Sequence, residues 1–531
     1  MQTAHILAFD IGTTGVKTCL FAVSDTISLL AFDSAGYGLY TKPDGSAEQV
    51  FDEWWDALCK TSKAVLAQNK LPSDAVIDGI SFCSQMQGMV LLGEDGLPVR
   101  NPMSYMDQRA RKQLKDGMAY GPQIAGSNIP RLLKSLKYTG AVAASVKDPV
   151  WKYKWVEENE PEVFARARYW VDVKESLISK MTGNAVMTRD SAFAALIYDI
   201  HKGEWSAPVC KMLGVDLKHL PPIIESADQA GALLPAAAAD LGLTAGIPVF
   251  GGGGDASLIP VGAGACAAGD THVYSGTSGW VSTAVTKSIV DTSAMIAAVV
   301  GAQNGLYNYF GELETAGKCL EWVKDHLALD EIGLFIKKEH VAEGFETKYT
   351  SLYDYLGEVI DSTAAGSGGV IFTPWLHGNR CPFEDPNARG MFFNVSLDTG
   401  KTELIRAVVE GVCYHLRWFL EVSAKKVTPS GTLRFVGGGA LSDVTSQILA
   451  DVTGKVIEVV DNPQNAGAVG AAAVAAVGLG LLPNLEATKV LIPAVKSFTP
   501  NPDNAAVHAR NFAVFQQLYK ANKKLFAELN S

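Results

Sequence analysis

Two short turns, each made of glycine and hydroxyl residues, have the composition that a polyphosphate requires of its binding loop. They are Gly12-Thr13-Thr14-Gly15 and Gly276-Thr277-Ser278-Gly279. Glycine lets the backbone approach a ligand closely, and successive backbone N–H groups form a concave site for an anion. Either turn alone is more typical of an ordinary β-hairpin. Two such turns, one in each half of the chain, indicate that a nucleotide tail can be held from both sides.

Asp10 lies just before the first turn, with Ile11 between them. A carboxylate beside bound phosphates is unfavourable unless a divalent cation lies between them, so Asp10 indicates a site for Mg²⁺, held directly or through water. Its simpler alternative role is to cap the turn.

Asp255 follows the four glycines 251–254 and opens an expected helix. Its ordinary role would be a helix N-cap. Its functional role would be a general base that takes a proton from a substrate hydroxyl as that oxygen attacks phosphorus, which is typically worth about 10² to 10⁴ in rate. Four consecutive glycines carry an entropic cost, and this favours the functional role because some group must come close to the backbone there.

Other catalytic motifs are missing or weak. The sequence has no Walker loop, no His-Glu-x-x-His and no Gly-x-Ser-x-Gly. Gly251-x-Gly253-x-x-Ala256, and the loop 437–440 with Asp461 about twenty residues on, match a dinucleotide fingerprint weakly. An NAD-dependent oxidoreductase is therefore the alternative, although it leaves the paired turns unexplained. A non-catalytic ATP-binding sensor is a further alternative, but it would need no base at Asp255.

The elements around the two turns repeat. Strand patterns at 5–10 and 16–23 flank the first turn, and strand patterns at 271–275 and 280–285 flank the second. The turns begin 264 residues apart, close to half of the 531-residue chain, which predicts a duplicated, two-domain α/β protein. The segment 247–250 enters the four-glycine run, so we expect one domain over residues 1–246 and a second over residues 247–531.

Alternating helix and strand patterns fill the remaining chain. Apolar spacing predicts helices over 51–67 and 150–167 and a strand over 76–82. Residues 432–460 read as a strand, a glycine loop, a helix and a strand, a unit that brings a ligand to the carboxyl end of a sheet. The uncharged stretch 466–483 is rich in Ala and Gly, which predicts a helix packed closely on a sheet in preference to a membrane span.

Composition excludes several classes of protein. Hydrophobic residues make up 48% of the chain and charged residues 19%, which argues against disorder. The formal charge of -11 and the absence of long basic runs disfavour nucleic acid as a partner. Eight widely spaced cysteines and an amino terminus without a leader pattern indicate reduced thiols and a cytoplasmic location. A homodimer is left open.

Together these motifs resemble the FGGY carbohydrate kinases of the actin-like ATPase superfamily. Residues 10–17 are similar to the first phosphate motif of that family, residues 253–255 to its catalytic-base motif, residues 275–279 to its second phosphate motif and residues 437–440 to its adenosine motif. Residues 390–410 are similar to a family signature, although Asn394 replaces a glycine. The motifs occur in order from about residue 6 to 480.

The resemblance implies two RNase H-like domains around a central cleft, with ATP and Mg²⁺ as cofactors. By matching position, Asp255 would be the catalytic base and Asp10 would serve the metal. The nucleotide would contact these residues: Gly12, Thr13, Thr14, Lys17, Gly276, Thr277, Ser278, Gly438, Gly439 and Ala440. The expected chemistry is in-line transfer of the γ-phosphoryl group, with domain closure excluding water.

Within the family the substrate segments look like those of xylulokinases. Gln85, Met86 and Gln87 fall in a sugar-contacting segment, and Asp107 falls in a second one, so these residues are expected to bind substrate together with Asp255. The implied reaction converts D-xylulose, a ketopentose, to D-xylulose 5-phosphate. Gln87 replaces the usual His, and an amide cannot take a positive charge. Another ketose or polyol, such as ribulose, erythritol or a glycerol-like alcohol, is therefore the alternative substrate.

Overall fold

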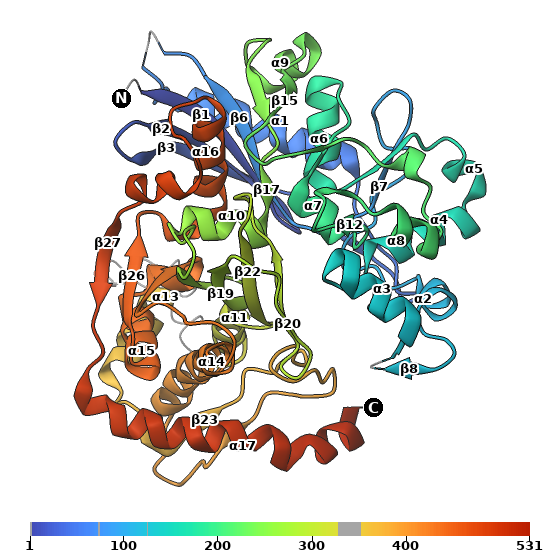
Figure 1. Ribbon diagram of the computed structural model, residues 1–531. Coiled ribbons are helices and arrows are strands. Elements are labelled where there is room, and N and C mark those ends of the chain that lie inside the picture. The colour runs from blue at the N-terminus through green and yellow to red at the C-terminus, as the bar shows by residue number, and fades with distance from the viewer. Residues whose placement is uncertain (1–2, 73–74, 125, 328–351, 531) are drawn as a thin grey trace, which may run out of the picture.

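The computed structural model describes residues 3–72, 75–124, 126–327 and 352–530. The protein is a mixed α/β structure built on two large sheets, one from the first half of the chain and one from the second (Figure 1). All eight cysteines lie in described segments and are unpaired thiols, as their wide spacing predicts.

The first sheet has the order β3–β2–β1–β6–β16–β15. β1 is antiparallel to β2 and parallel to β6, and a short strand, β17, also pairs with β6. The strands are β1 (Ala4–Ile11), β2 (Gly15–Val23), β3 (Ile27–Gly36), β6 (Gly79–Ser84), β15 (Gln229–Ala232), β16 (Pro248–Phe250) and β17 (Gly253–Gly254).

The second sheet has the order β20–β21–β22–β19–β18–β25–β26–β27. β18 is antiparallel to β19 and parallel to β25. The strands are β18 (Thr271–Ser275), β19 (Gly279–Val285), β20 (Val290–Asp291), β21 (Ile296–Val300), β22 (Tyr307–Leu313), β25 (Thr432–Val436), β26 (Val456–Val460) and β27 (Ala494–Phe498).

Six strands of each sheet share one topology. The series β3–β2–β1–β6–β16–β15 corresponds strand by strand to β22–β19–β18–β25–β26–β27, and every neighbouring pair has the same relative direction in both sheets. The expected duplication of an α/β domain is therefore confirmed at the level of topology.

The predicted division after residue 246 stays a prediction. β16 and β17 lie beyond that residue, yet both pair with β6 of the first sheet. By strand pairing, the first sheet therefore extends to Gly254, the residue immediately before Asp255.

Helices cover both sheets. Those of the first half are α1 (Phe51–Ala67), α2 (Arg111–Gly117), α3 (Ile129–Thr139), α4 (Pro149–Asn159), α5 (Pro161–Phe164), α6 (Val173–Thr182), α7 (Arg189–Ala194), α8 (Ala207–Leu213) and α9 (Pro235–Leu241). Those of the second half are α10 (Asp255–Gly262), α11 (Gly317–His326), α13 (Leu352–Ser362), α14 (Lys401–Ser423), α15 (Asp443–Thr453), α16 (Ala466–Gly478) and α17 (Ala505–Asn530).

Short two-stranded sheets pair β4 (Tyr40–Thr41) with β5 (Ala47–Glu48), β7 (Val90–Leu92) with β10 (Tyr169–Val171), β8 (Gln123–Ile124) with β9 (Ser127–Asn128), β11 (Met187–Thr188) with β14 (Ile223–Ile224), β12 (Tyr198–Asp199) with β13 (Glu204–Trp205), and β23 (Ile371–Phe372) with β24 (Phe392–Phe393).

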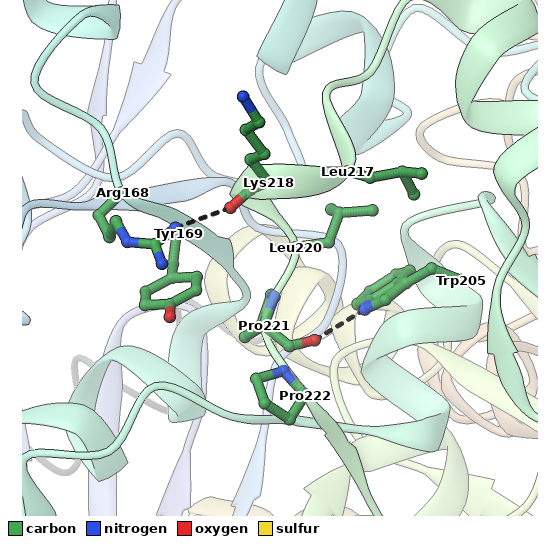
Figure 2. A pocket seen from close by; sticks show the side chains of 8 residues that line it. All are labelled: Arg168, Tyr169, Trp205, Leu217, Lys218, Leu220, Pro221 and Pro222. Atoms are coloured by element: carbon green, nitrogen blue, oxygen red, sulfur yellow. Dashed lines mark hydrogen bonds between the residues drawn. The ribbon is translucent and has the colours of Figure 1, made fainter.

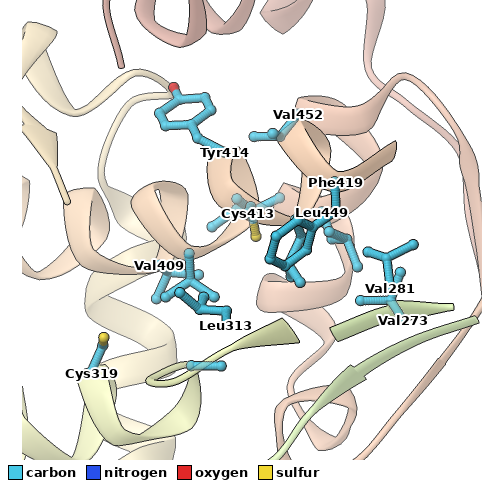
Figure 3. Close-up of a cluster of buried hydrophobic side chains, with 14 of the residues drawn as sticks. Val273, Val281, Leu313, Cys319, Val409, Cys413, Tyr414, Phe419, Leu449 and Val452 are labelled. Carbon is cyan, nitrogen blue, oxygen red and sulfur yellow. The ribbon is translucent and has the colours of Figure 1, made fainter. Parts of the chain in front are cut away.

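The core of the second half lies between its sheet and α14. Figure 3 shows Val273 and Val281 of the sheet facing Phe419 of α14 and Leu449 of α15, all of them buried. Removing this apolar surface from water is the main force that fixes the helices on the sheet, at about 25 cal/mol per Å².

Two helices meet where the halves join. α16 lies against β1 and β6 of the first sheet, although it belongs to the second half of the chain, and it packs on α10 (Figure 1). A β-carbon on Gly262 would overlap the carbonyl oxygen of Ala466, and one on Gly470 would overlap that of Leu258. Glycine thus permits backbone contact here. The expected close packing of 466–483 on a sheet is confirmed over α16, and none of the described helices is long and apolar enough to cross a membrane.

Helix and strand boundaries differ from prediction at two places. The helix expected over 150–167 is divided at Pro161, because proline lacks the N–H needed to continue α4 and begins α5 instead. The strand expected over 76–82 begins at Gly79 and continues to Ser84, because its pairing with β1 continues to Ile11. The helix expected over 51–67 is α1 without change.

Candidate active site

The first glycine–threonine turn joins β1 and β2, whose last paired residues are Ile11 and Val16. The Gly12 N–H donates to the Gly15 carbonyl at 2.9 Å, and the Tyr37 hydroxyl donates to the Gly12 carbonyl at 2.5 Å. These bonds occupy inward-facing groups of the turn. The side chain of Thr14 is exposed and Gly12 and Thr13 are partly exposed, so the outer surface of the turn is accessible.

The second turn joins β18 and β19 and contacts α11. The carbonyls of Gly276 and Thr277 accept hydrogen bonds from the N–H groups of Gly317 and Ala316, at 2.8 and 3.1 Å. Thr277 is exposed, and Gly276 and Ser278 are partly exposed. The predicted phosphate-contacting residues of this turn thus face solvent while their carbonyls are held by protein.

The predicted adenosine loop lies directly behind the second turn. Gly437 has a φ of 92°, and a β-carbon there would lie 2.5 Å from the Ser275 carbonyl oxygen, so only glycine fits. Gly438 is exposed, Gly439 is partly exposed and packs against the Ser275 side chain, and Ala440 is buried.

The two halves of the chain converge beside the first turn. Lys17 Nζ donates to the Gln464 carbonyl at 3.0 Å, in the loop before α16. A β-carbon on Gly467 of α16 would lie 3.2 Å from Asp10 Oδ2. Burial raises the pKa of Tyr274, on the strand before the second turn, and the carboxylates of Asp10 and Asp255 add to this rise. Tyr274 of the second sheet is therefore near both aspartates.

Asp10 is partly accessible at the end of β1. Burial raises its pKa, and the Lys17 ammonium and a hydrogen bond from Cys83 oppose this rise. Among the described residues, no three histidine, cysteine, aspartate or glutamate side chains gather as ready-made metal ligands. A single accessible carboxylate fits Mg²⁺, which is usually held by one or two carboxylates together with phosphate oxygens and water.

Asp255 begins α10 directly after β17, and its side chain is partly accessible. Burial raises its pKa to about 7, and the negative charges of Glu312, Asp10 and Asp190 add to the rise. The N–H of Ala256 donates to Oδ1 at 2.7 Å and opposes it. A carboxylate whose pKa lies near neutrality is a stronger base than an ordinary aspartate.

The predicted sugar loop lies beside this carboxylate. A β-carbon on Gly254 would overlap the sulfur of Met86, so Met86 packs against the residue before Asp255. Gln87 has a φ of 62°, and its N–H and that of Gly88 both donate to Asp172 at 2.9 Å. Lys152 Nζ donates to the Gln87 carbonyl at 2.8 Å.

Gln85 and Asp107 are positioned as anchors. Gln85 is buried and donates to Gln49 Oε1 at 2.9 Å, while Gln49 donates to the Thr13 carbonyl of the first turn at 2.8 Å. Asp107 is fully buried, and its carboxylate accepts the Ala47 N–H at 2.9 Å and the Arg109 guanidinium at 2.8 Å. A direct contact of Asp107 with sugar would require breaking these bonds.

Several residues near Asp255 were not found from the sequence. Glu312 of β22 and Arg380 form an ion pair at 2.5 Å, and the negative charge of Glu312 raises the pKa of Asp255. The Tyr105 hydroxyl lies 3.4 Å from Thr13 Oγ1, and its pKa is raised by burial and further by Asp255 and Glu312. No local motif marks Glu312 or Arg380, because they are far from Asp255 in the sequence and come near it only in the folded protein. Asp172 was detectable only as an N-cap before a helix.

Another concave surface lies apart from these residues. Figure 2 shows a pocket of about 680 Å³ in the first half, where Trp205 donates to the Pro221 carbonyl and Arg168 to the Lys218 carbonyl. None of the predicted site residues lines this pocket. It therefore has no part in the candidate active site.

Two copies of one sheet topology, each with a glycine–hydroxyl turn, define the actin-like ATPase fold, and solved structures of sugar kinases share it over the whole chain. The chain belongs to the FGGY family of carbohydrate kinases: residues 5–262 match the N-terminal domain of that family and residues 272–479 match its C-terminal domain. It is thus a sugar kinase, a phosphotransferase that uses ATP as co-substrate and a small sugar as acceptor. This removes the basis for an oxidoreductase.

Individual relatives differ in their named substrates. The xylulose kinase of Lactococcus lactis is 29% identical over 528 residues, covering 99% of this chain and 98% of the relative. The gluconokinase of Bacillus licheniformis is 25% identical over 533 residues, with the same coverage. The crystal structure of a ligand-bound xylulose kinase from Lactobacillus acidophilus superposes with a TM-score of 0.83, 25% identity and coverage of 99% of this chain and 100% of that one.

Proposed function

We propose that this kinase phosphorylates D-xylulose to D-xylulose 5-phosphate, with Asp255 as the general base. One observation carries the proposal: the Asp255 carboxylate has a pKa raised to about 7, lies beside the Met86–Gln87 loop and is near Asp10, at the end of β1 just before the first turn. A base, a sugar-binding loop and a phosphate-binding turn are thereby within reach of one another.

In the proposed reaction, Asp255 accepts the proton of the sugar hydroxyl while the sugar oxygen forms a bond to the γ-phosphorus. The bond from that phosphorus to the bridging oxygen breaks, and ADP leaves. The N–H groups and hydroxyls of Thr13 and Thr14 would bind phosphate from one side, and those of Thr277 and Ser278 from the other. Gly12 and Gly276, whose N–H groups are bonded within the turns, would let the phosphate approach the backbone. Lys17 would neutralise negative charge.

Asp10 would hold Mg²⁺, which when bound neutralises phosphate charge. The base moiety of ATP would lie against Gly438, Gly439 and Ala440, where the open surface at Gly438 leaves room for it. We expect the kinase to act in the cytoplasm, and a homodimer stays open.

The charges near Asp255 favour a neutral sugar over an aldonic acid. Arg380 is a cation that would attract a substrate carboxylate, but its guanidinium is already paired with Glu312 and lies 4.0 Å from Glu314. A gluconate ion would have to compete with both. Gln87 can donate to and accept from a hydroxyl without requiring charge. These contacts support a ketopentose, whereas the identity to relatives does not separate xylulose kinases from gluconokinases.

A coupled ADP-release assay with D-xylulose, D-ribulose, erythritol, glycerol and D-gluconate tests the substrate. We expect the largest kcat/KM with D-xylulose, and mass spectrometry should find the phosphate on its terminal hydroxyl. Preference for D-gluconate by more than tenfold would contradict the ketopentose assignment and leave the kinase class intact.

Asp255→Asn tests the base. The amide has the same shape but accepts no proton, so kcat should fall by about 10² to 10⁴ while the Kd for ADP stays within twofold. Turnover near that of the unmodified enzyme would remove Asp255 from this role.

A further inference from the structure

The helix that begins with Asp255 has no side-chain cap at its N-cap position, although the Asp255 carboxylate accepts the Ala256 N–H. Its N-cap residue is Gly254, which has no side chain to accept a backbone N–H. The first N–H groups of a helix need acceptors from elsewhere, and a negatively charged acceptor at this end is favoured by the helix dipole. The position of the base therefore depends on whichever group supplies that acceptor.

Asp190 of α7 supplies it. Its Oδ2 accepts the Gly254 N–H at 2.7 Å and also accepts the Ser257 hydroxyl. These two partners flank Asp255, one residue before it and two residues after it. Asp190 is buried, with 1% of its surface exposed, so the bonds are protected from competing water.

The charge of Asp190 is balanced by a buried lysine. Lys174 of α6 is completely buried, and its Nζ donates to Thr188 Oγ1 and Ser191 Oγ at 2.6 Å each, besides pairing with Glu175. The Thr188 hydroxyl in turn donates to Asp190 Oδ1 at 2.5 Å. The Lys174 ammonium and the hydrogen bonds to Asp190 lower the pKa of Asp190 despite its burial, so it remains an anionic acceptor.

The same turn of α6 holds the sugar loop. Asp172, the N-cap of α6, accepts the N–H groups of Gln87 and Gly88. Lys174 lies only two positions further along the chain. Figure 1 shows α6, α7, β17 and α10 as neighbours, and contacts join α7 to β17.

We propose that Asp190 is a positioning residue for the reaction. The first turn of α6 fixes the sugar loop relative to the base: Asp172 holds the sugar loop, and Lys174 holds the base segment through Asp190. The inference rests on the proposed role of Asp255. A displacement of about 1 Å in such a site can cost about 10²-fold in rate. The network would act on the transition state more than on sugar binding, because Asp190 contacts the base segment and not the Gln87 loop.

Asp190→Asn tests this directly. An asparagine oxygen can still accept the Gly254 N–H and the Ser257 hydroxyl that Oδ2 now accepts, but it carries no full negative charge, and the amide NH₂ replaces the Oδ1 acceptor of the Thr188 hydroxyl. We expect kcat to fall by about 10- to 100-fold and the sugar KM to change by less than about threefold. Retention of kcat within twofold would overturn the proposal.

The pH profile supplies a readout that a merely structural role would not change. The titratable groups that interact with the charge of Asp255 are the carboxylates of Glu312, Asp10 and Asp190, the hydroxyls of Tyr105 and Tyr274 and the thiol of Cys83. Removing one of the three negative charges should lower the pKa of Asp255, so the acidic limb of kcat/KM should move to lower pH. If the acidic limb of the variant stays at the pH found for the unmodified enzyme and kcat is also unchanged, the inference is contradicted.

Asp199→Asn is the matched control. Asp199 is also buried and accepts the N–H groups of His201 and Lys202, at 3.0 and 3.2 Å, but it contacts neither the base segment nor the sugar loop. This variant should have a lower Tm, but its kcat, its sugar KM and the acidic limb of its pH profile should match those of the unmodified enzyme. If Asp190→Asn does not fold, Ser257→Ala decides: about a threefold to tenfold loss of kcat at constant sugar KM supports the proposal, and kcat within twofold overturns it.

A failure of the proposed function can be distinguished from a failure of this inference. If the unmodified enzyme phosphorylates none of the sugars in the assay panel, the function is wrong. If it does so and the Asp190 variant is equally active, only the positioning role is wrong.

Discussion

Asp255 shows how the surroundings of a single side chain decide its chemistry. The same residue type begins many helices as a simple cap, but here burial and three neighbouring carboxylates raise its pKa to about 7. Ionisation of Asp255 therefore destabilises the folded protein at neutral pH. This cost links the stability of the protein to the function proposed for Asp255.

Replacing Asp255 by Asn should consequently stabilise the protein at high pH. The folded pKa lies above the unfolded value of 3.8, so the folded state binds a proton that the unfolded state has lost between about pH 4 and pH 7. Stability then falls as pH rises through this window, and the Asn variant avoids the loss. We expect its Tm to exceed that of the unmodified protein by about 2 to 4 °C at pH 8 and by almost nothing at pH 4. Calorimetry at both pH values measures this, and a lower Tm at pH 8 would contradict it.

Lys17 is the other residue whose effect can be tested alone. Its ammonium donates to the Gln464 carbonyl and opposes the rise that burial causes in the pKa of Asp10. Hydrogen bonds to charged groups are worth about 1.5 to 3 kcal/mol, so Lys17→Met should raise the KM for ATP by about tenfold or more. Lys60→Met, at an exposed position of α1, is the control and should leave this KM unchanged. If both changes raise the KM for ATP equally, the loss of positive charge as such explains the effect and the position of Lys17 does not.

At the scale of elements, the contact between α10 and α16 decides how the halves meet. These helices follow corresponding strands in the two sheets, and glycines allow their backbones to touch. α10 also begins with Asp255, so a displacement of this contact would be transmitted to the base.

Gly470→Ala should therefore impair both stability and turnover. The added methyl would overlap the Leu258 carbonyl, a backbone atom that cannot rotate away. Overpacking typically costs about 1 to 3 kcal/mol, and we expect kcat to fall at least about tenfold as α10 shifts. Gly357→Ala in α13, where a β-carbon meets no atom within 4 Å, should leave kcat unchanged. Denaturant unfolding and steady-state kinetics compare the two variants.

At the scale of the whole molecule, a polar contact holds the two halves together away from the site. Arg189 of α7 donates to Asn304 Oδ1 and to the Gly301 carbonyl, in the loop between β21 and β22, and Asn304 donates to Glu225. Arg189, Asn304 and Glu225 line a cavity of about 410 Å³ between the halves. The contact favours the arrangement in which both turns can reach one nucleotide.

Asn304→Ala should shift the protein away from that arrangement. The apparent affinity for each substrate falls with the population of the competent state, so the KM values for ATP and for sugar should rise by the same factor, about threefold to tenfold, with kcat within twofold. Small-angle scattering should detect a larger radius of gyration. Lys202→Ala, in the wall of the same cavity, is the control. A loss of kcat at constant KM would contradict this account.

The sequence by itself determined the duplicated α/β fold, the two turns and the position of Asp255, because glycine runs, hydroxyl residues and strand periodicity are local properties. It also singled out the segment of Met86 and Gln87. The structure places Met86 against the residue before Asp255, and the sugar-binding role of the segment stays a prediction. It did not reveal that β16 and β17 complete the first sheet, because sheet membership depends on the partner strand, β6.

Only the tertiary structure decided which charges surround the base. Glu312 lies 57 positions beyond Asp255 and Asp190 lies 65 before it, and each acts through space. Three features arise from side chains that meet only after folding: the raised pKa of Asp255, the burial of Asp107 and the acceptor that Asp190 provides at the start of α10. Electrostatic and hydrogen-bonding energies depend on distance in space, and the order of residues along a chain does not contain that distance.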